Sequence, residues 1–168
     1  YIVLRDLDEN INVIGSDQPW LEVRSLSGDL LQRLHYKLSG DTLILSHLRS
    51  KDMKPVKISI FVPKSGLKGI TADSAEAVVS GLERTLFHIE QYAGRIRMSH
   101  NPIGKIDLKA SGRSYFDFSD TNLDTLSVKI EESHVYISSP ISVLEGSMKI
   151  NSFLRVIDVD EIQFKKDE

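Results

Sequence analysis

Two glutamates and a histidine lie within four positions in the stretch SVKIEESHVYISS, residues 127–139. Glu131, Glu132 and His134 are residue types that bind metal ions or transfer protons. Side chains of a β-strand alternate between its two faces, so the same residues would equally suit a corner and the solvent-facing side of a strand. The choice between these interpretations depends on the elements that position the three residues.

The five histidines of the chain show no metal-site spacing. His35, His47, His88, His100 and His134 form no His-x-x-x-His pair, and the sequence has no cysteine that could add a thiolate ligand. We therefore predict no metal site and no cofactor.

Three aspartates raise the alternative of sugar chemistry. Asp117, Asp120 and Asp124 are close in sequence, and pectin-cleaving β-helices carry acidic clusters on one face. However, the segment 120–122 has the composition of a turn. The sequence has no Gly-x-Ser-x-Gly motif, no phosphate-binding loop and no nucleophile beside a base. We therefore predict a non-enzymatic protein and keep a polysaccharide-cleaving β-helix as the alternative.

Composition limits the classes of partner. The 168 residues fit one domain, and 40% hydrophobic with 27% charged residues is typical of a globular chain. A net charge of −3 provides no basic field for nucleic acid. No apolar run is long enough for a transmembrane span. The sequence begins at Tyr1, so we expect that a leader peptide preceded it and was removed.

Hydrophobic residues alternate along most of the chain, which predicts strands. In the segment 56–63, VKISIFVP, every second residue is apolar up to the terminating proline. The segment 27–40 fits a helix through its leucines, but Leu34, Tyr36 and Leu38 also alternate, and we predict a strand there.

From Leu67 onward the pattern repeats with a period just under twenty residues. Repeats start at Leu67, Leu86, Ile103 and Leu123, and a fainter one starts at Ile141. Each unit reads as two short strands joined by a corner, and neither strand can bury its inner face alone. Stacked units would form a β-solenoid. A two-layer sandwich of hairpins is the second interpretation.

The same register aligns residues on the surface. It places the small residues Ser74, Ala93 and Ala110 at one corner position. At the position that precedes the next inward residue, the register places Glu76 beside Arg95 on adjacent rungs. Opposite charges in such a position contribute about 0.2–1 kcal/mol per pair. By the same register, the sequence places Arg113 beside Glu132.

A candidate binding surface follows from the neighbouring column. The register predicts that Arg97, Tyr115 and His134 lie side by side on solvent-facing positions, with Tyr136 close to them. A flat strip of aromatic and basic side chains suits an extended glycan or peptide, through stacking and hydrogen bonds. These four residues are the predicted ligand-binding residues.

The sequence resembles the auto-transporter adhesin, head GIN domain family of secreted bacterial proteins, which is common in Bacteroidetes. Similar segments occur in the family's order: ENINVIG (9–15), PWLEVRS (19–25), SGDTLIL (39–45) and VKISIFVPKSGLKGITADSAEAVVSG (56–81). The family carries Gly-Ser-Gly-like triplets, and in this sequence only ASG (110–112) is close to such a triplet. The resemblance implies a right-handed β-helix-like fold, export across the inner membrane, and no established catalytic residues.

The resulting expectation is an all-β, right-handed solenoid with an N-terminal strand region. We expect one domain over 1–168, with N-terminal strands in 1–65, solenoid repeats in 66–157 and a charged cap or tail in 158–168. We expect an exported protein of the periplasm or outer surface, acting as an adhesin or scaffold. Its expected partners are a glycan, a cell-surface protein or further copies of itself, since open strand edges favour pairing.

Overall fold

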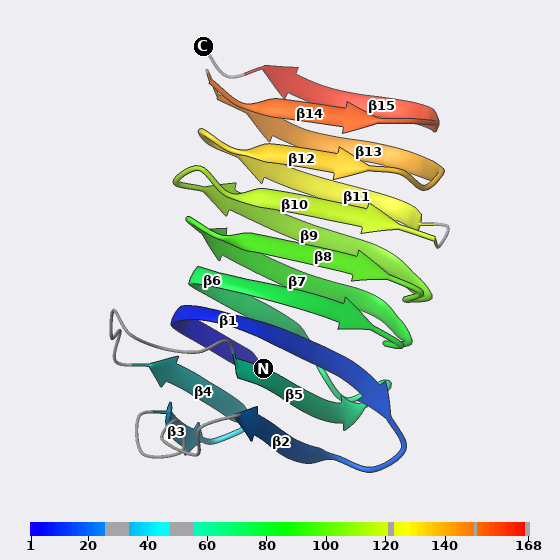
Figure 1. The fold of residues 1–168 in the computed structure, drawn as a ribbon. Coiled ribbons are helices and arrows are strands. Elements are labelled where there is room, and N and C mark those ends of the chain that lie inside the picture. The colour runs from blue at the N-terminus through cyan, green and yellow to red at the C-terminus, as the bar shows by residue number, and fades with distance from the viewer. Residues whose placement is uncertain (26–33, 48–55, 121–122, 150, 167–168) are drawn as a thin grey trace.

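A computed structural model of the protein describes residues 1–25, 34–47, 56–120, 123–149 and 151–166. Within these ranges every regular element is a β-strand and there is no helix. Parallel strands stack coil upon coil into a β-solenoid with two flat sheets (Figure 1). The predicted fold class is confirmed.

Each coil contributes one strand to a back sheet and then one strand to a front sheet. The 12-residue strand β6 (Gly69–Ser80) crosses both sheets by itself. Separate strands build the later coils: β7 (Arg84–Tyr92), β8 (Arg95–Ser99), β9 (Ile103–Ser111), β10 (Tyr115–Ser119), β11 (Leu123–Ile130), β12 (His134–Ile137), β13 (Ile141–Met148), β14 (Phe153–Val156) and β15 (Val159–Lys166). The even-numbered strands from β8 to β14 lie in the front sheet, and the odd-numbered strands from β7 to β15 lie in the back sheet. Front strands run left to right in Figure 1 and back strands right to left while the chain rises, which makes the coil right-handed.

The N-terminal strands join the same two sheets in a different chain order. They are β1 (Ile2–Ser16), β2 (Trp20–Ser25), β3 (Leu34–Ser39), β4 (Thr42–His47) and β5 (Val56–Pro63). Strand β1 lies between β6 on one side and β4 and β5 on the other, all in parallel. Strands β2 and β3 are antiparallel to β5 and β4 and end the two sheets.

The structure can be compared with the predictions for two segments, 27–40 and 158–168. The strand predicted within 27–40 is confirmed for Leu34–Ser39, while residues 26–33 lie outside the described residues. The segment 158–168, expected to be a cap or tail, contains the last back strand, β15.

The core lies between the two sheets and consists of the inward side chains of each strand. Ile96, Phe116 and Val135 occupy one position on successive front strands, and all are fully buried. Burying an aliphatic or aromatic side chain of this size contributes about 1.5–3 kcal/mol. Because one rung covers the next, the core extends along the whole stack.

The predicted register is wrong between the second and third repeats, by two residues. Ile89 pairs with Leu108 in the structure, whereas the prediction aligned it with Ile106. Ala110 therefore lies opposite Gln91 inside a strand and not at the corner position of Ala93. A shift of two residues keeps every side chain on the same face of its strand, so alternation alone did not reveal it.

Each corner from the back to the front sheet contains a described residue in the left-handed backbone conformation. Ser74, Ala93, Arg113, Glu132 and Asn151 all have positive φ angles, between 45° and 67°. This region costs a residue with a Cβ about 1–2 kcal/mol, which explains why small or glycine residues would suit the corner. The chain tolerates a variety of residues there because the stacked strands on both sides hold the turn.

Asn101 closes the opposite corner between β8 and β9. Its side chain is fully buried; the amide nitrogen donates to the carbonyls of Val79 (3.0 Å) and Ser99 (2.8 Å), and the amide oxygen accepts from the Leu82 N–H (3.0 Å). These bonds satisfy backbone groups that the end of a strand would otherwise leave unpaired.

Candidate functional site

The front sheet carries the predicted binding residues on its outer surface. Tyr115 and His134 lie opposite each other on β10 and β12, and Tyr136 follows two residues after His134 on the same face. The prediction for Arg97 is wrong in register, because Arg97 lies opposite Asp117. The residue beside Tyr115 on β8 is Arg95.

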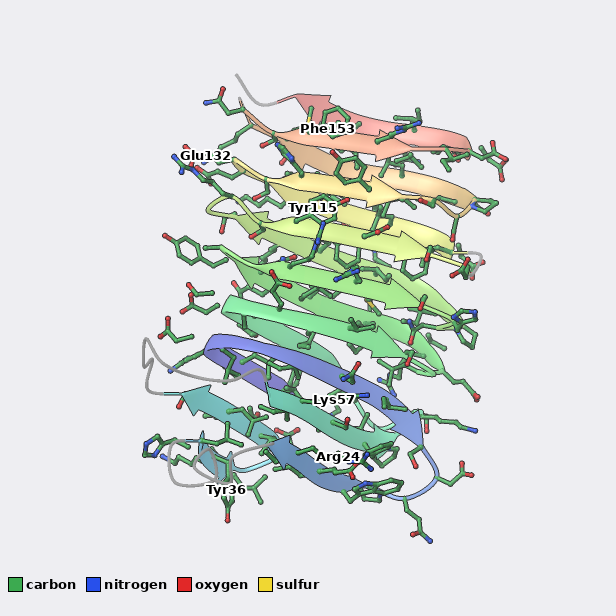
Figure 2. All side chains as sticks on the ribbon, viewed as in Figure 1. Arg24, Tyr36, Lys57, Tyr115, Glu132 and Phe153 are labelled. Atoms are coloured by element: carbon green, nitrogen blue, oxygen red, sulfur yellow. The ribbon has the colours of Figure 1, made fainter. Side chains whose placement is uncertain are left out.

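These side chains form a stack along the solenoid axis, which we call the front ladder: Arg95, Tyr115, Tyr136 and Phe153. The Arg95 guanidinium lies 4.2 Å from the Tyr115 ring centroid. The Tyr115 and Tyr136 rings stack at 4.9 Å with 27° between their planes, and Tyr136 lies 5.3 Å from Phe153. His134 meets the Phe153 ring edge-on at 5.9 Å. Tyr115 and Phe153 mark the two ends of the aromatic part in Figure 2.

The fold places equal positions of the repeat about 4.8 Å apart, which aligns Arg95, Tyr115, His134 and Phe153, and Tyr136 reaches Tyr115 and Phe153 from the neighbouring position two residues along β12. Their inward neighbours, Phe116 and Val135, are fully buried and fix the strands beneath the ladder. Arg95 also lies opposite Glu76, so the predicted pairing of these two positions is confirmed. Stacked aromatic and guanidinium groups add about 0.5–1 kcal/mol at exposed sites, which favours one defined arrangement of the ladder.

A second, polar column runs beside the front ladder. Arg97, Asp117, Tyr136 and Arg155 occupy one position on β8, β10, β12 and β14. Guanidinium and carboxylate groups are planar and offer several hydrogen-bond donors or acceptors at fixed angles. The column therefore supplies hydrogen-bonding groups next to the aromatic surface.

The corner beside the ladder is hollowed. A shallow depression of about 460 Å³ is lined by Arg113, Ser114, Tyr115, Glu132, His134 and Asn151. Arg113 and Glu132 are adjacent there, as predicted, and the Arg113 N–H donates to the Glu132 carbonyl oxygen at 2.9 Å. The depression extends the polar surface from the ladder around the edge of the sheet.

The acidic and imidazole groups that first suggested chemistry are separated by the fold. Glu132 lies at the corner, Glu131 pairs with Lys149 at 3.0 Å, and His134 lies against Phe153. Among the residues that the structure describes, no group of three or more histidines, aspartates or glutamates is placed to hold a metal ion.

The three aspartates do not share a face either. Asp117 lies on front strand β10, Asp120 has a positive φ at the corner, and Asp124 lies on back strand β11. Asp117 is the member of this group that belongs to the polar column of the front sheet.

Sequence reasoning missed Arg95, Asp117, Phe153 and Arg155 as members of this surface. The offsets of the earlier repeats, counted from Ile141, place Phe153 at an inward position, but in the structure Phe153 is 44% exposed and Leu154 takes the inward position. The sequence signal that could have placed Phe153 is the extra residue of the last corner. A one-residue change in spacing exchanges the two faces of the strand that follows.

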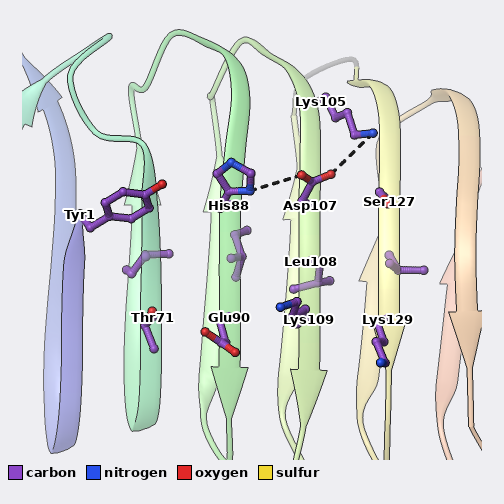
Figure 3. Close-up of a pocket in the computed structure, with 13 residues that line it drawn as sticks. Tyr1, Thr71, His88, Glu90, Lys105, Asp107, Leu108, Lys109, Ser127 and Lys129 are labelled. Atoms are coloured by element: carbon purple, nitrogen blue, oxygen red, sulfur yellow. Dashed lines mark ion pairs between the residues drawn. The ribbon is translucent and has the colours of Figure 1, made fainter.

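The back sheet has a shallow groove of about 550 Å³ across β7, β9 and β11 (Figure 3). His88 Nδ1 lies 3.3 Å from Asp107, and Lys105 Nζ lies 3.6 Å from Asp107 and 2.8 Å from Glu145. The hydrogen bond to Glu145 raises the pKa of Lys105, and the same bond lowers the pKa of Glu145. His88, Asp107, Lys105 and Glu145 are thus engaged with one another at this groove.

No protein-family model and no curated protein matches the sequence, so membership of the head GIN family stays a prediction. Two solved structures share the fold. A putative adhesin from Bacteroides fragilis matches with a TM-score of 0.65 and 14% identity, over 98% of this chain and 88% of the other. A putative lipid binding protein from Parabacteroides distasonis matches with a TM-score of 0.72 and 14% identity, over 98% of this chain and 73% of the other. At this identity the likeness establishes the fold.

The search for membrane-spanning helices gave a negative result. Within the described ranges, no helix has the length and hydropathy needed to cross a bilayer.

Proposed function

We propose that the protein is a non-enzymatic, exported cell-envelope protein whose front sheet binds an extended glycan. The observation that carries this proposal is the front ladder, in which Tyr115, Tyr136 and Phe153 stack across three rungs of a flat, exposed sheet. A surface of this length and flatness fits a linear chain better than a compact small molecule.

The geometry of the rings favours edge and hydroxyl contacts. Because Tyr115 and Tyr136 stack on each other, and Arg95 lies over Tyr115, most ring faces are occupied within the ladder. The phenol hydroxyls and the polar groups of Arg97 and Asp117 are then the groups that meet a ligand. Sugar hydroxyls both donate and accept hydrogen bonds, and this mixture of donors and acceptors complements them.

Charge favours an acidic glycan among the possible chains. The guanidinium group of Arg95 is part of the ladder, those of Arg97 and Arg155 lie beside it, and Asp117 contributes one carboxylate in the polar column. A guanidinium binds a carboxylate through two parallel hydrogen bonds. We therefore expect uronate-containing chains to bind more tightly than neutral chains.

The comparisons support a binding role in a general way. One structural neighbour is described as a putative adhesin and the other as a putative lipid binding protein, and both descriptions refer to binding. The front ladder favours a glycan over a lipid for this chain, because the ladder is an open surface rather than an enclosed apolar cavity, and its neighbouring groups Arg97, Asp117 and Arg155 are charged. Placement at the periplasm or outer surface is part of the same proposal.

The test is glycan binding on a panel of immobilised neutral and uronate-containing polysaccharides. We expect binding by the unmodified chain, and a two- to tenfold loss for Tyr136→Ala, since one aromatic contact contributes about 0.5–1.5 kcal/mol. Arg97→Ala is expected to reduce binding mainly to the uronate-containing chains. Absence of binding to every glycan would exclude the proposal.

Tyr36→Ala is the matched control, because Tyr36 is 69% exposed on β3, far from the ladder. It should leave binding unchanged. The same samples are assayed for newly formed chain ends. Cleavage that Asp117→Asn abolishes would establish the polysaccharide-cleaving alternative in place of the proposed function.

A further inference from the structure

The C-terminal end of the solenoid exposes side chains that belong to the core. Ile141 and Leu144 on β13 are 2% and 5% exposed, and their partners on the last back strand, β15, are Val159 and Ile162. Ile162 is 65% exposed although it continues an inward column. No described strand lies beyond β15 to cover it.

The backbone of this end is open in the same way. Strand β15 pairs with β13 and strand β14 pairs with β12, and neither has a second partner among the described strands. An unpaired strand edge next to apolar side chains is a template for another strand, and natural proteins usually cover such edges. The end surface therefore has both the hydrogen-bonding groups and the apolar area of an interface.

The sequence of β15 indicates what would cover it. Around Gln163 the strand reads Glu161-Ile162-Gln163-Phe164-Lys165, with an acidic residue on one side, a basic residue on the other and apolar residues between. Glu161, Gln163 and Lys165 alternate with Ile162 and Phe164, so the charged and the apolar residues lie on opposite faces. When a second copy of the strand runs in the opposite direction, its basic residue lies opposite the acidic residue of the first copy, and apolar residues lie opposite apolar residues.

We propose that β15 pairs with β15 of a second copy, antiparallel and centred on Gln163, to form a twofold-symmetric dimer. In this register Glu161 lies opposite Lys165 of the second copy, twice by symmetry, and Ile162 lies opposite Phe164. The twofold axis is perpendicular to the sheets, so both back sheets join into one. The apolar ends of the two cores then cover each other.

Two other arrangements of copies agree less well with the strand. A parallel, in-register pairing would place Glu161 opposite Glu161, and like charges directly opposite are destabilising. Head-to-tail stacking would place β15 against the N-terminal end, where β2 and β3 are antiparallel strands, and would extend without limit. The antiparallel dimer pairs each Glu161 with a Lys165 of opposite charge, and it leaves no C-terminal edge open for further copies.

The test begins with sedimentation velocity of the whole 168-residue chain over about a hundredfold range of concentration. We expect a reversible monomer–dimer equilibrium. Ile162→Ser should weaken the dimer by tenfold or more, on the order of one lost apolar contact at each of two symmetric positions. A chain that is monomeric at all concentrations, or that forms filaments, would overturn the proposal.

Charge reversal defines the register. Glu161→Lys and Lys165→Glu each turn two attractive pairs into repulsive ones, and each should weaken its own dimer by about tenfold or more. Mixing the two variants should restore a heterodimer, because each introduced charge then faces its opposite. Glu83→Lys, an exposed charge reversal before β7, is the matched control and should leave dimerisation unchanged. Homodimers that persist in both β15 variants would place the interface elsewhere and refute the antiparallel pairing.

Discussion

The two ends of the solenoid are built differently. At the N-terminal end, the antiparallel strands β2 and β3 lie along the last parallel strands, β5 and β4, and the inward side chain of Ile58 on β5 is fully buried. At the C-terminal end, β14 and β15 keep the parallel direction and stop, and Ile162 is 65% exposed. The reversed strand β2 thus covers an inward isoleucine of β5, whereas no described strand covers Ile162, although the end strand β3 likewise leaves Tyr36, opposite the buried Leu45, 69% exposed.

The difference shows what ends a stack of parallel coils. Any outermost strand presents an open edge, but a strand that reverses direction also leads the chain out of the coil, so that no further coil is added. The N-terminal end gains its antiparallel strands because β1 occupies a rung between β5 and β6, and the intervening chain folds back below it. The C-terminal end has no such excursion among the described residues.

The largest expected effect comes from the same substitution at both ends. Ile58→Ala removes a fully buried side chain and should lower the free energy of unfolding by about 2–5 kcal/mol. Ile162→Ala removes an exposed one and should change it by less than about 0.5 kcal/mol in dilute solution. Urea unfolding of the two variants measures the contrast. Equal losses would mean that the C-terminal end is covered in solution as fully as the N-terminal end.

A second contrast concerns polar side chains that tie rungs together. Among the described residues, Ser139 is the last polar residue along the chain that is buried as a whole, and it precedes β13, β14 and β15. Asn101→Ala should cost about 1–3 kcal/mol, because the Leu82 N–H and two carbonyls lose their buried partner. Thermal unfolding reports the loss.

Asn151→Gly is the matched control for the asparagine substitution, because Asn151 is exposed at the corner before the open end. Its effect on stability should stay within about 0.5 kcal/mol. A comparable loss in both variants would show that the coils near the open end are tied together as firmly as the inner ones.

The sequence predicted the repeat and the faces of the strands, because alternation reports directly which side chains are buried. It did not predict the register fully. The two-residue error at Ile106 preserved the faces and moved Tyr115 from the column of Arg95 to that of Arg97. The one-residue error at Phe153 exchanged the faces and hid an aromatic member of the ladder.

The sequence repeat also did not predict the position of β1 in the stack. A repeat in sequence predicts that neighbours in the chain are neighbours in the stack, but β1 pairs with β4 and β5 across a long excursion. The candidate site could be predicted in its location, on the front sheet around Tyr115 and His134. Its composition depended on the exact corner lengths, which alternation does not encode.

A third prediction tests the corners, each of which has a residue with a positive φ from the first coils to the last. Ala93 has a φ of 45°, where glycine is less strained, so Ala93→Gly should raise the free energy of unfolding by about 0.5–1 kcal/mol. Ala72→Gly, in the fully buried interior of β6, should lower it by about 1 kcal/mol. Urea unfolding gives both values. A loss in both variants would show that strain at the corner is absent.

The smallest effect is expected from the ion pair that reaches toward the open end. Lys105 on β9 bonds Glu145 on β13 across the intervening strand β11, but both side chains are more than a third exposed. Water screening limits such a pair to a few tenths of a kcal/mol, so Glu145→Gln should destabilise by about 0.3 kcal/mol near neutral pH.

The pH dependence of this difference has a defined sign. The pKa of Glu145 is lowered by Lys105, so the contribution of Glu145 is present above the pKa of an unfolded carboxyl group and is lost as pH falls through the folded value. The pKa of Lys105 is raised by Glu145, so the contribution of Lys105 is lost as pH rises through its folded value. The free energies of unfolding of the unmodified chain and of the Glu145→Gln variant should therefore become equal in acid. A difference that persists in acid would mean that Glu145 stabilises the rungs near the open end through contacts other than its charge.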